Sequence, residues 1–188
     1  MLGLKLGKMD LQSPVIMMSG IFSYGEADLG YLDYSTIGAV VTKTITLEPR
    51  QGNPQPRIWE AGSGMLNSIG LQNPGIKDFV SHGIPSLMDR GVRTIVSISG
   101  QDSGEILSMM ESLSALGVET VEINLSCPNV HRDRPMISQS ARLTGQLLRD
   151  VKREFGQVFV IAKLSPNVTD ISEIAIAAEE GGADGLSM

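Results

Sequence analysis

The single cysteine of the chain, Cys127, lies in a polar segment that directly follows an apolar stretch typical of a buried strand. Asn124, Ser126 and Asn129 surround the thiol with polar groups, whereas an isolated free cysteine is most often a small buried hydrophobic residue. A partly ionised thiol can take part in catalysis, and the pKa of a free cysteine is about 8.5. No catalytic histidine partner is evident, so a Cys/His pair of the protease type is only weakly supported. A reactive and a structural cysteine both stay open at this point.

Two lysines, Lys43 and Lys163, each end an apolar stretch that has the composition of a buried strand. A lysine in such a position either extends its ammonium group to solvent or places it against an anion. Two ammonium groups at a similar depth indicate a negatively charged ligand.

The segment 44–75 is rich in glycine, proline and side-chain amides, and it is too long for a plain connection. Long loops without regular structure in compact domains usually have a function. Within it, the stretch 67–75 offers amides and backbone N–H groups that suit a planar polar ring carrying a carboxylate. The alternative is a covering loop whose asparagines and glycines form turns.

The elements that must position these residues follow from the hydrophobic pattern. Apolar stretches typical of buried strands lie at 14–19, 39–43, 94–98, 118–124, 158–163 and 183–188, and helices are predicted at 102–116, 138–155 and 170–180. Strands that are apolar on both faces and alternate with helices indicate a parallel sheet covered by helices. The opening 4–11 resembles a short hairpin. The fold class is therefore α/β.

Polar residues at the ends of successive strands favour a barrel over an open sheet. They are Ser19, Lys43, Ser97, Asn124 and Lys163, and no G-x-G-x-x-G follows the first strand. In a (β/α)8 barrel all of these ends meet at one mouth, where the active site lies. A complete barrel takes about 250 residues. We therefore predict a single domain over 1–188 with about six βα units of a TIM barrel, truncated at its C-terminal side or completed by another chain.

The composition excludes several classes of function. The net charge of −6 argues against nonspecific nucleic-acid binding, which relies on clustered lysine and arginine. No apolar run approaches the length of about 20 residues that a transmembrane helix needs, and no signal peptide is evident. A single cysteine can form neither an internal disulfide nor a cysteine-rich metal site. The sequence thus predicts a soluble, cytoplasmic protein without a metal centre.

Four segments together carry a family resemblance. Thr-Lys-Thr at 42–44, the run 48–57, the run 64–75 and Asn-Leu-Ser-Cys-Pro-Asn at 124–129 resemble the dihydroorotate dehydrogenase family, in order and over essentially the whole chain. Cys127 stands where membrane-bound relatives have serine, which indicates the cytosolic branch. The Gly-Leu-Gln-Asn-Pro-Gly at 70–75 is more similar to the two-subunit, NAD-linked class than to the fumarate-using class.

The resemblance implies a reaction and a set of site residues. The family oxidises dihydroorotate to orotate in de novo pyrimidine biosynthesis, and FMN accepts the hydride from C6 while a base, here Cys127, removes the C5 proton. The residues that match substrate-binding positions are Lys43, Asn67, Ser68, Ile69, Gly70, Leu71, Asn124 and Asn129. Those that match FMN-binding positions are Ser19, Lys43, Thr44, Ser97, Asn124 and Lys163.

The resemblance also implies partners and shows departures. It implies a homodimer of catalytic subunits and a partner subunit that carries FAD and an iron–sulfur cluster. Ser97 stands where this class has an asparagine, and the loop 131–138 lacks the expected glycine and phenylalanine. The chain also ends before the last two strands, which in this family hold the FMN phosphate, so weak FMN binding is expected. The alternatives are another FMN-dependent pyrimidine reductase or dehydrogenase, and a flavin-free homologue that acts as a scaffold.

Overall fold

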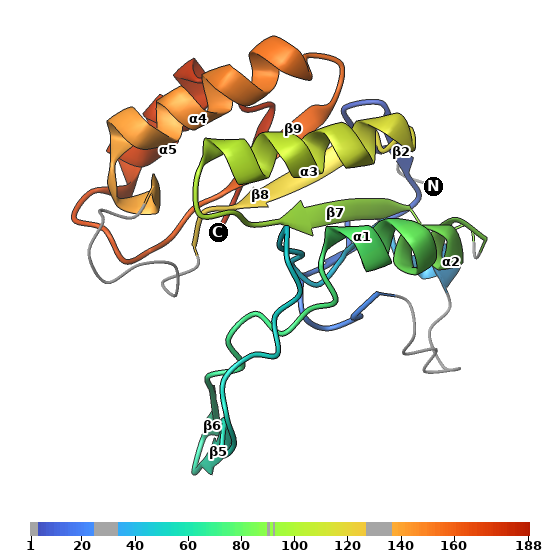
Figure 1. Cartoon of the computed structure of the whole chain (residues 1–188), viewed down its shortest axis with the longest axis vertical. Coiled ribbons are helices and arrows are strands. Elements are labelled where there is room, and N and C mark those ends of the chain that lie inside the picture. The colour runs from blue at the N-terminus through green and yellow to red at the C-terminus, as the bar shows by residue number, and fades with distance from the viewer. Residues whose placement is uncertain (1–3, 25–33, 90, 92, 127–136) are drawn as a thin grey trace.

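The computed structural model describes residues 4–24, 34–89, 91, 93–126 and 137–188. Its centre is a parallel sheet in the order β10-β9-β8-β7-β4-β3, so the spatial order of the strands follows the chain. The strands are β3 (Ile16–Met17), β4 (Ala39–Val41), β7 (Thr94–Ile98), β8 (Thr120–Asn124), β9 (Phe159–Lys163) and β10 (Gly185–Ser187). In Figure 1 the strands β7, β8 and β9 of this sheet cross the middle of the body. The α/β half-barrel and its six predicted strands are confirmed.

Three of the helices pack along one side of this sheet and begin at local caps (Figure 1). They are α3 (Ser103–Ala115), α4 (Ala141–Glu154) and α5 (Ile171–Glu180). The Asp102 side chain accepts from Glu105 N–H at 3.0 Å, and the Asp170 side chain accepts from Ser172 N–H at 2.8 Å. The predicted helix 138–155 begins later than expected, because Ser140 caps α4 and the short 3-10 helix η3 (Ile137–Gln139) precedes it.

The expectation of a segment 44–75 without regular structure is wrong for its middle part. An antiparallel hairpin of β5 (Ile58–Ala61) and β6 (Gly64–Asn67) projects from the body as an arm, which Figure 1 shows plainly. Every residue of its two strands is exposed. Regular hydrogen bonding between the strands, rather than burial, therefore forms this element.

Further short elements complete the described part of the chain. A helical stretch, α1 (Ile76–Asp78), η2 (Phe79–Gly83) and α2 (Ile84–Asp89), connects the arm segment to β7, and η1 (Tyr34–Thr36) precedes β4. The predicted N-terminal hairpin is confirmed as β1 (Leu4–Leu6) paired with β2 (Met9–Leu11). Among the helices in the described ranges, none combines the length and the apolar character needed to cross a membrane.

Two apolar clusters lie on opposite faces of the sheet. The larger fills the space between sheet and helices and includes Met109, Met110 and Leu148. The smaller lies on the barrel-interior face, consists of Leu11, Ala39, Val41, Ile95 and Ile161, and is covered by the N-terminal hairpin. Because side chains alternate along a strand, Ser97 of β7 follows Ile95 on the interior face. The interior therefore changes from apolar to polar toward the C-terminal strand ends.

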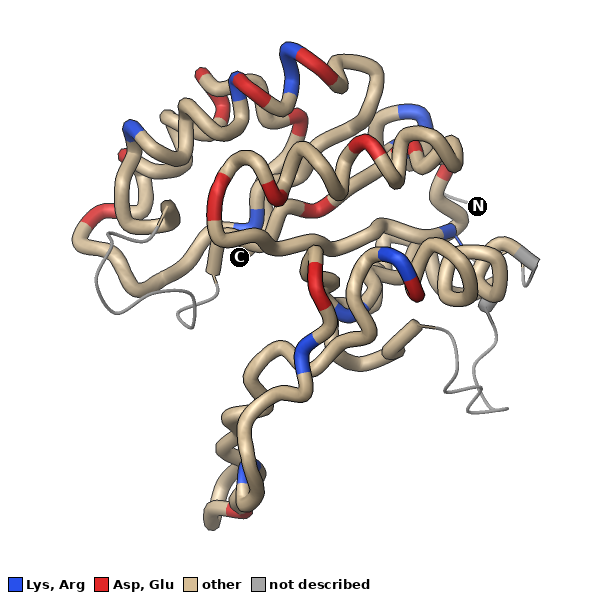
Figure 2. The backbone as a smooth tube through the Cα atoms, in the orientation of Figure 1, with Lys and Arg blue, Asp and Glu red and all other residues tan. Residues whose placement is uncertain are grey.

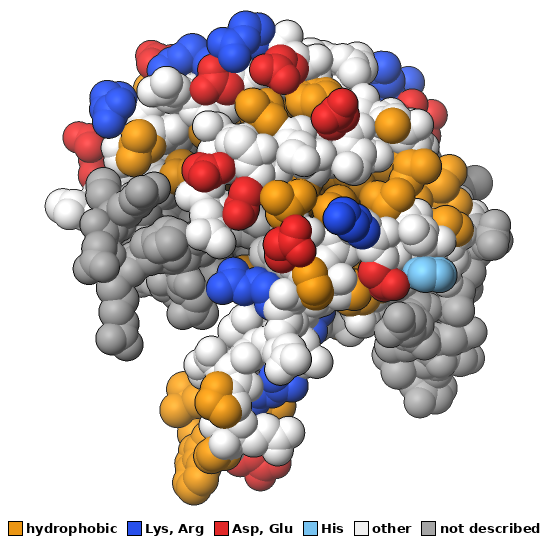
Figure 3. All heavy atoms as spheres, in the orientation of Figure 1, with side chains coloured by type: hydrophobic (Ala, Val, Ile, Leu, Met, Phe, Trp, Pro, Cys, Tyr) orange, Lys and Arg blue, Asp and Glu red, His pale blue; other side chains and the backbone are white. Residues whose placement is uncertain are grey.

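The charged residues in Figure 2 are distributed mainly along the helices and loops around the sheet. Figure 3 shows acidic and basic side chains interspersed on this face, without a continuous basic patch. This view agrees with the acidic balance of the composition. The same figure shows hydrophobic side chains gathered at the tip of the arm.

Candidate functional site

A connected set of polar side chains lies at the C-terminal ends of the strands. Thr44 Oγ1 lies 3.0 Å from Ser97 Oγ and 3.4 Å from Ser19 Oγ, and it accepts from Asn124 Nδ2 at 3.0 Å. These four residues follow or belong to β3, β4, β7 and β8. Each was predicted to bind the cofactor, and the fold brings all four into one network.

The network also includes a buried carboxylate, Glu122, that the sequence analysis did not assign to the site. Ser97 Oγ donates to Glu122 Oε1 at 3.1 Å, and Ser187 Oγ of β10 donates to Glu122 Oε2 at 2.8 Å. Glu122 is only 4% exposed. Its signal in the sequence is a carboxylate within the apolar strand 118–124, two residues before Asn124 and so on the same face. We call Ser19, Thr44, Ser97, Glu122, Asn124 and Ser187 the strand-end network.

Asn124 also holds the segment that leads to Cys127. Its Oδ1 accepts from the backbone N–H of Ser126 at 3.0 Å and from Ser126 Oγ at 2.7 Å. Its backbone carbonyl accepts from Ser99 Oγ at 3.1 Å. Cys127 and Asn129 themselves lie outside the described residues. The residue before Cys127 is therefore attached to the network by two bonds.

The two predicted lysines are half-buried at the ends of β4 and β9, two strands of the sheet that are separated by β7 and β8. Burial lowers the pKa of Lys43 below its ordinary value, and the nearby Arg57 guanidinium lowers it further. Lys163 ends β9, where it is in register with Asn124 of β8 and Ser187 of β10. This rim of the sheet therefore carries cationic groups next to the strand-end network.

The predicted substrate-binding stretch 67–71 is held by the arm segment itself. Asn67 is exposed and pairs with Ile58 in the hairpin. Asn53 Nδ2 donates to the carbonyl and the hydroxyl of Ser68, both at 2.9 Å, and Asn53 N–H donates to the carbonyl of Ile69 at 3.0 Å. Among the described hydrogen bonds, none joins Asn67, Ser68, Ile69, Gly70 or Leu71 to the strand-end network.

Asn73 anchors the root of the arm, and the sequence analysis did not single it out. Its Oδ1 accepts from the backbone N–H of Thr46 at 3.2 Å and of Gly75 at 2.9 Å. Its Nδ2 donates to Thr46 Oγ1 at 2.9 Å and to the carbonyl of Leu71 at 2.7 Å. This buried amide fits the interpretation in which asparagines of the segment form turns, and it joins both ends of the loop.

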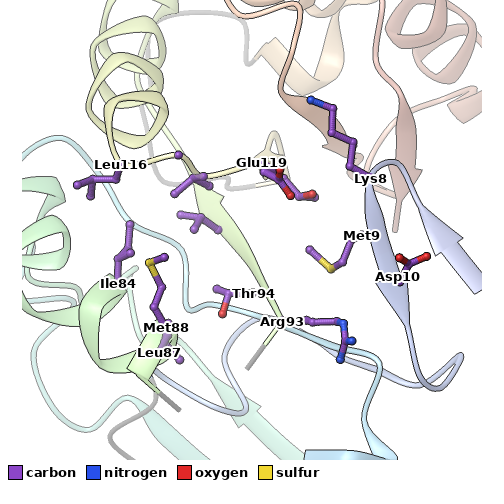
Figure 4. A pocket seen from close by; sticks show the side chains of 14 residues that line it. Lys8, Met9, Asp10, Ile84, Leu87, Met88, Arg93, Thr94, Leu116 and Glu119 are labelled. Carbon is purple, nitrogen blue, oxygen red and sulfur yellow. The ribbon is translucent and has the colours of Figure 1, made fainter. Parts of the chain in front are cut away.

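A separate cavity of about 420 Å³ lies at the opposite end of the strands (Figure 4). It is lined by the first residues of β7 and β8, the end of α3 and the N-terminal hairpin, including Thr94, Leu116, Thr120 and Met9. Barrel active sites lie at the C-terminal strand ends. In the described ranges, no group of three or more histidine, cysteine or acidic side chains is arranged to hold a metal ion.

The fold is that of an α/β-barrel protein, present here as a half-barrel, with a network of polar side chains at the C-terminal strand ends. Comparison with known families gives a match to the dihydroorotate dehydrogenase model over residues 1–188. The chain therefore belongs to the dihydroorotate dehydrogenase family.

Two curated relatives of the chain are catalytic subunits of class B dihydroorotate dehydrogenases. The chain is 42% identical over 187 residues to the catalytic subunit of dihydroorotate dehydrogenase B (NAD(+)) from Thermoanaerobacter pseudethanolicus, and 44% identical over 188 residues to that from Desulforamulus reducens. Each alignment covers 100% of this chain and 62% of the relative. The chain thus spans about three fifths of the length of these curated relatives.

A solved structure confirms the architecture. The crystal structure of dihydroorotate dehydrogenase from Eimeria tenella in complex with ferulenol superposes with a TM-score of 0.76 at 20% sequence identity. The superposition covers 98% of this chain and 58% of the other. At this identity the likeness concerns the fold alone, and it agrees with part of a TIM barrel.

Proposed function

We propose that this chain provides the catalytic face of a class B dihydroorotate dehydrogenase, which oxidises dihydroorotate to orotate in pyrimidine biosynthesis. The observation that carries the proposal is the strand-end network. Ser19, Thr44, Ser97 and Asn124 come from four strands and form one connected set. Family membership supplies the reaction, and the network supplies the residues that would support it.

The residues at the rim fit the ring of FMN, the cofactor that the family implies. Asn124 keeps one N–H of its amide beyond the bond to Thr44, and Lys43 and Lys163 add ammonium groups at the C-terminal ends of β4 and β9. Such donors suit the acceptor atoms of a flavin and the negative charge of its reduced form. FMN, when bound, supplies a two-electron acceptor for the hydride from C6.

The residues of this chain would perform the remaining steps. We assign removal of the C5 proton to Cys127, whose preceding residue is fixed to Asn124 by two hydrogen bonds. The Lys43 ammonium would bind the substrate carboxylate by a charge-assisted hydrogen bond. Amides at Asn67, Asn124 and Asn129 can donate to the carbonyls and accept from the N–H groups of a pyrimidine. Residues 68–71 would close over the carboxylate.

The class of the relatives supports an assembly. We propose a homodimer of catalytic subunits that works with a partner subunit carrying FAD and an iron–sulfur cluster, located in the cytoplasm. In this arrangement the partner subunit would receive the two electrons taken from the substrate. The proposal rests on the class B relatives.

The test is an anaerobic visible spectrum of the purified 188-residue chain with FMN, before and after addition of dihydroorotate. The whole catalytic subunit from Desulforamulus reducens serves as the positive control. We expect dihydroorotate to bleach the bound flavin, more slowly in Cys127→Ser and not at all in Cys127→Ala.

Two results would contradict the proposal. Full-rate bleaching by Cys127→Ala would remove Cys127 as the base. Absence of flavin binding both by this chain and by a form extended to the length of its relatives would leave the flavin-free scaffold as the better function.

A further inference from the structure

A path of hydrogen bonds runs from Glu122 through Ser97 and Thr44 to Asn124. The donor and the acceptor are known at both ends of this path. At one end, the hydroxyls of Ser97 and Ser187 donate to the two oxygens of Glu122, which accept. At the other end, the backbone N–H of Ser126 only donates, so the atom of Asn124 that faces it must be the amide oxygen. The amide nitrogen of Asn124 therefore faces Thr44.

The directions between these ends follow because each hydroxyl has one proton. Ser97 gives its proton to Glu122 and must accept from Thr44, 3.0 Å away. Thr44 gives its proton to Ser97 and must accept from both Asn124 and Ser19. Thr44 then has one donated and two accepted bonds, which is the full capacity of a hydroxyl.

We propose that Glu122 is a positioning residue that sets the direction of the hydrogen bond between Thr44 and Ser97, while the Ser126 backbone N–H sets the orientation of the Asn124 amide. By taking the proton of Ser97, Glu122 directs the Thr44 proton to Ser97 and leaves both lone pairs of Thr44 to accept, one of them from the Asn124 amide nitrogen. The second N–H of that nitrogen then stays available to a ligand. Its link to FMN binding rests on the proposed function, because Asn124 is there a ligand-binding residue.

The burial of Glu122 makes this role testable by substitution. Burial of a carboxylate is unfavourable unless hydrogen bonds compensate it, and two serine hydroxyls do so here. Glutamine can reproduce the path, because its Oε1 can accept from Ser97 while its Nε2 donates to a free lone pair of Ser187. Methionine has a similar length but offers Ser97 no comparable acceptor. A positioning role therefore predicts rescue by glutamine.

The first measurement follows the Asn124 side-chain amide in the unliganded, 15N-labelled chain by NMR hydrogen exchange. We expect exchange in Glu122→Met to be about tenfold faster than in the wild type, with Glu122→Gln close to the wild type. Ser187→Ala is the matched control, because it removes a bond to the same carboxylate outside the path to Asn124. Ser97→Ala interrupts the path while Glu122 is present, and we expect the same faster exchange of the Asn124 amide as in Glu122→Met. It keeps the test available if Glu122→Met does not fold.

The second measurement is the FMN dissociation constant from quenching of flavin fluorescence. We expect an increase of about tenfold in Glu122→Met and Ser97→Ala, and of less than twofold in Glu122→Gln and Ser187→Ala. Equal loss in Glu122→Gln and Glu122→Met would overturn the inference in favour of a role for the charge. Unchanged amide exchange in Ser97→Ala would overturn it as well. A wild-type chain that binds no FMN would count against the proposed function, and the amide measurement would still decide the role of Glu122.

Discussion

Residues of the strand-end network and Asn67 of the β5–β6 arm were predicted to contribute to one ligand site, and the structure buries the network and exposes the arm. Thr44 and Ser97 are almost completely buried, and their hydroxyls lie 3.0 Å apart. Trp59 and Leu66 form a cross-strand pair on the arm, yet they are 69% and 67% exposed. Side chains at the ends of five strands form the network, whereas the described hydrogen bonds of β5 and β6 lie within the hairpin.

The difference shows how each group can serve a ligand. Side chains on the strand ends are prearranged, so a ligand gains their bonds without the cost of ordering them. Side chains on the arm are placed by a two-stranded hairpin, which is marginally stable by itself in water. Exposed apolar residues at the tip of the arm need further packing to become part of a rigid site.

The largest expected effect comes from removal of the amide that roots the arm. Asn73→Ala leaves the N–H groups of Thr46 and Gly75 and the carbonyl of Leu71 without the partner that they have in the fold. We expect a loss of about 2–4 kcal/mol in the free energy of unfolding, measured with urea. Asn53→Ala, which removes exposed hydrogen bonds of the same segment, is the control and should cost less than about 1 kcal/mol. Equal losses in both variants would show that the buried hydrogen bonds of Asn73 contribute no more to stability than the exposed hydrogen bonds of Asn53.

A smaller effect is expected within the strand-end network. Thr44→Val keeps the shape of the side chain and removes the hydroxyl that contacts Asn124, Ser97 and Ser19. We expect a loss of about 1–3 kcal/mol, because buried partners lose a bond. Ser68→Ala on the exposed loop is the control and should change stability by less than about 0.5 kcal/mol. A neutral Thr44→Val would mean that the network contributes nothing to stability.

The charge contact between the two regions gives a prediction on pH. Lys43 loses its proton in the folded chain at a lower pH than the unfolded value of 10.5. Between the lowered pKa and 10.5 the unfolded chain binds more protons, so Lys43 makes stability rise with pH in that range. Arg57→Gln removes the second cause, so we expect the pKa of Lys43 to rise but to stay below its ordinary value.

The measurement for this contact is an NMR titration of the Lys43 side chain. Arg50→Gln is the control, since burial and Arg57 are the causes of the shift. A Lys43 pKa that does not change in Arg57→Gln would show that the Arg57 charge has no effect on Lys43.

The smallest effect is expected at the tip of the arm. Trp59→Ser removes a largely exposed side chain that pairs with Leu66 across the hairpin, where such cross-strand pairs contribute about 0.2–1 kcal/mol locally. We expect the global free energy of unfolding to change by less than about 0.5 kcal/mol in thermal or urea melts. Leu113→Ala, a fully buried leucine of α3, is the contrasting variant and should cost about 2–5 kcal/mol. A large loss in Trp59→Ser would mean that the arm packs against other protein in solution.

Much of the fold could be predicted because its signals are local. The six strands are short apolar stretches, and Asp102 and Asp170 cap helices through bonds to residues three and two positions away. Ser140 caps α4 in the same way, through a bond to Leu143 three positions away. The helix was predicted to begin at 138 because the 3-10 helix η3 directly precedes this cap. The convergence of Ser19, Ser97 and Asn124 follows from parallel topology, which places all C-terminal strand ends on one edge. These features depend on neighbours in the sequence or on a general rule of architecture.

Only the tertiary structure decided which side chains of the site bind one another. The partner of Glu122 in β10 is 65 residues away, and the bond from Asn124 to Thr44 spans 80 residues. Such pairs depend on the register of strands that are distant in the sequence. The exposure of the arm also depends on what packs against it, since the hairpin pattern alone does not say which face is covered. Composition and periodicity thus determined the half-barrel and its polar edge, whereas long-range register determined the direction of its hydrogen bonds.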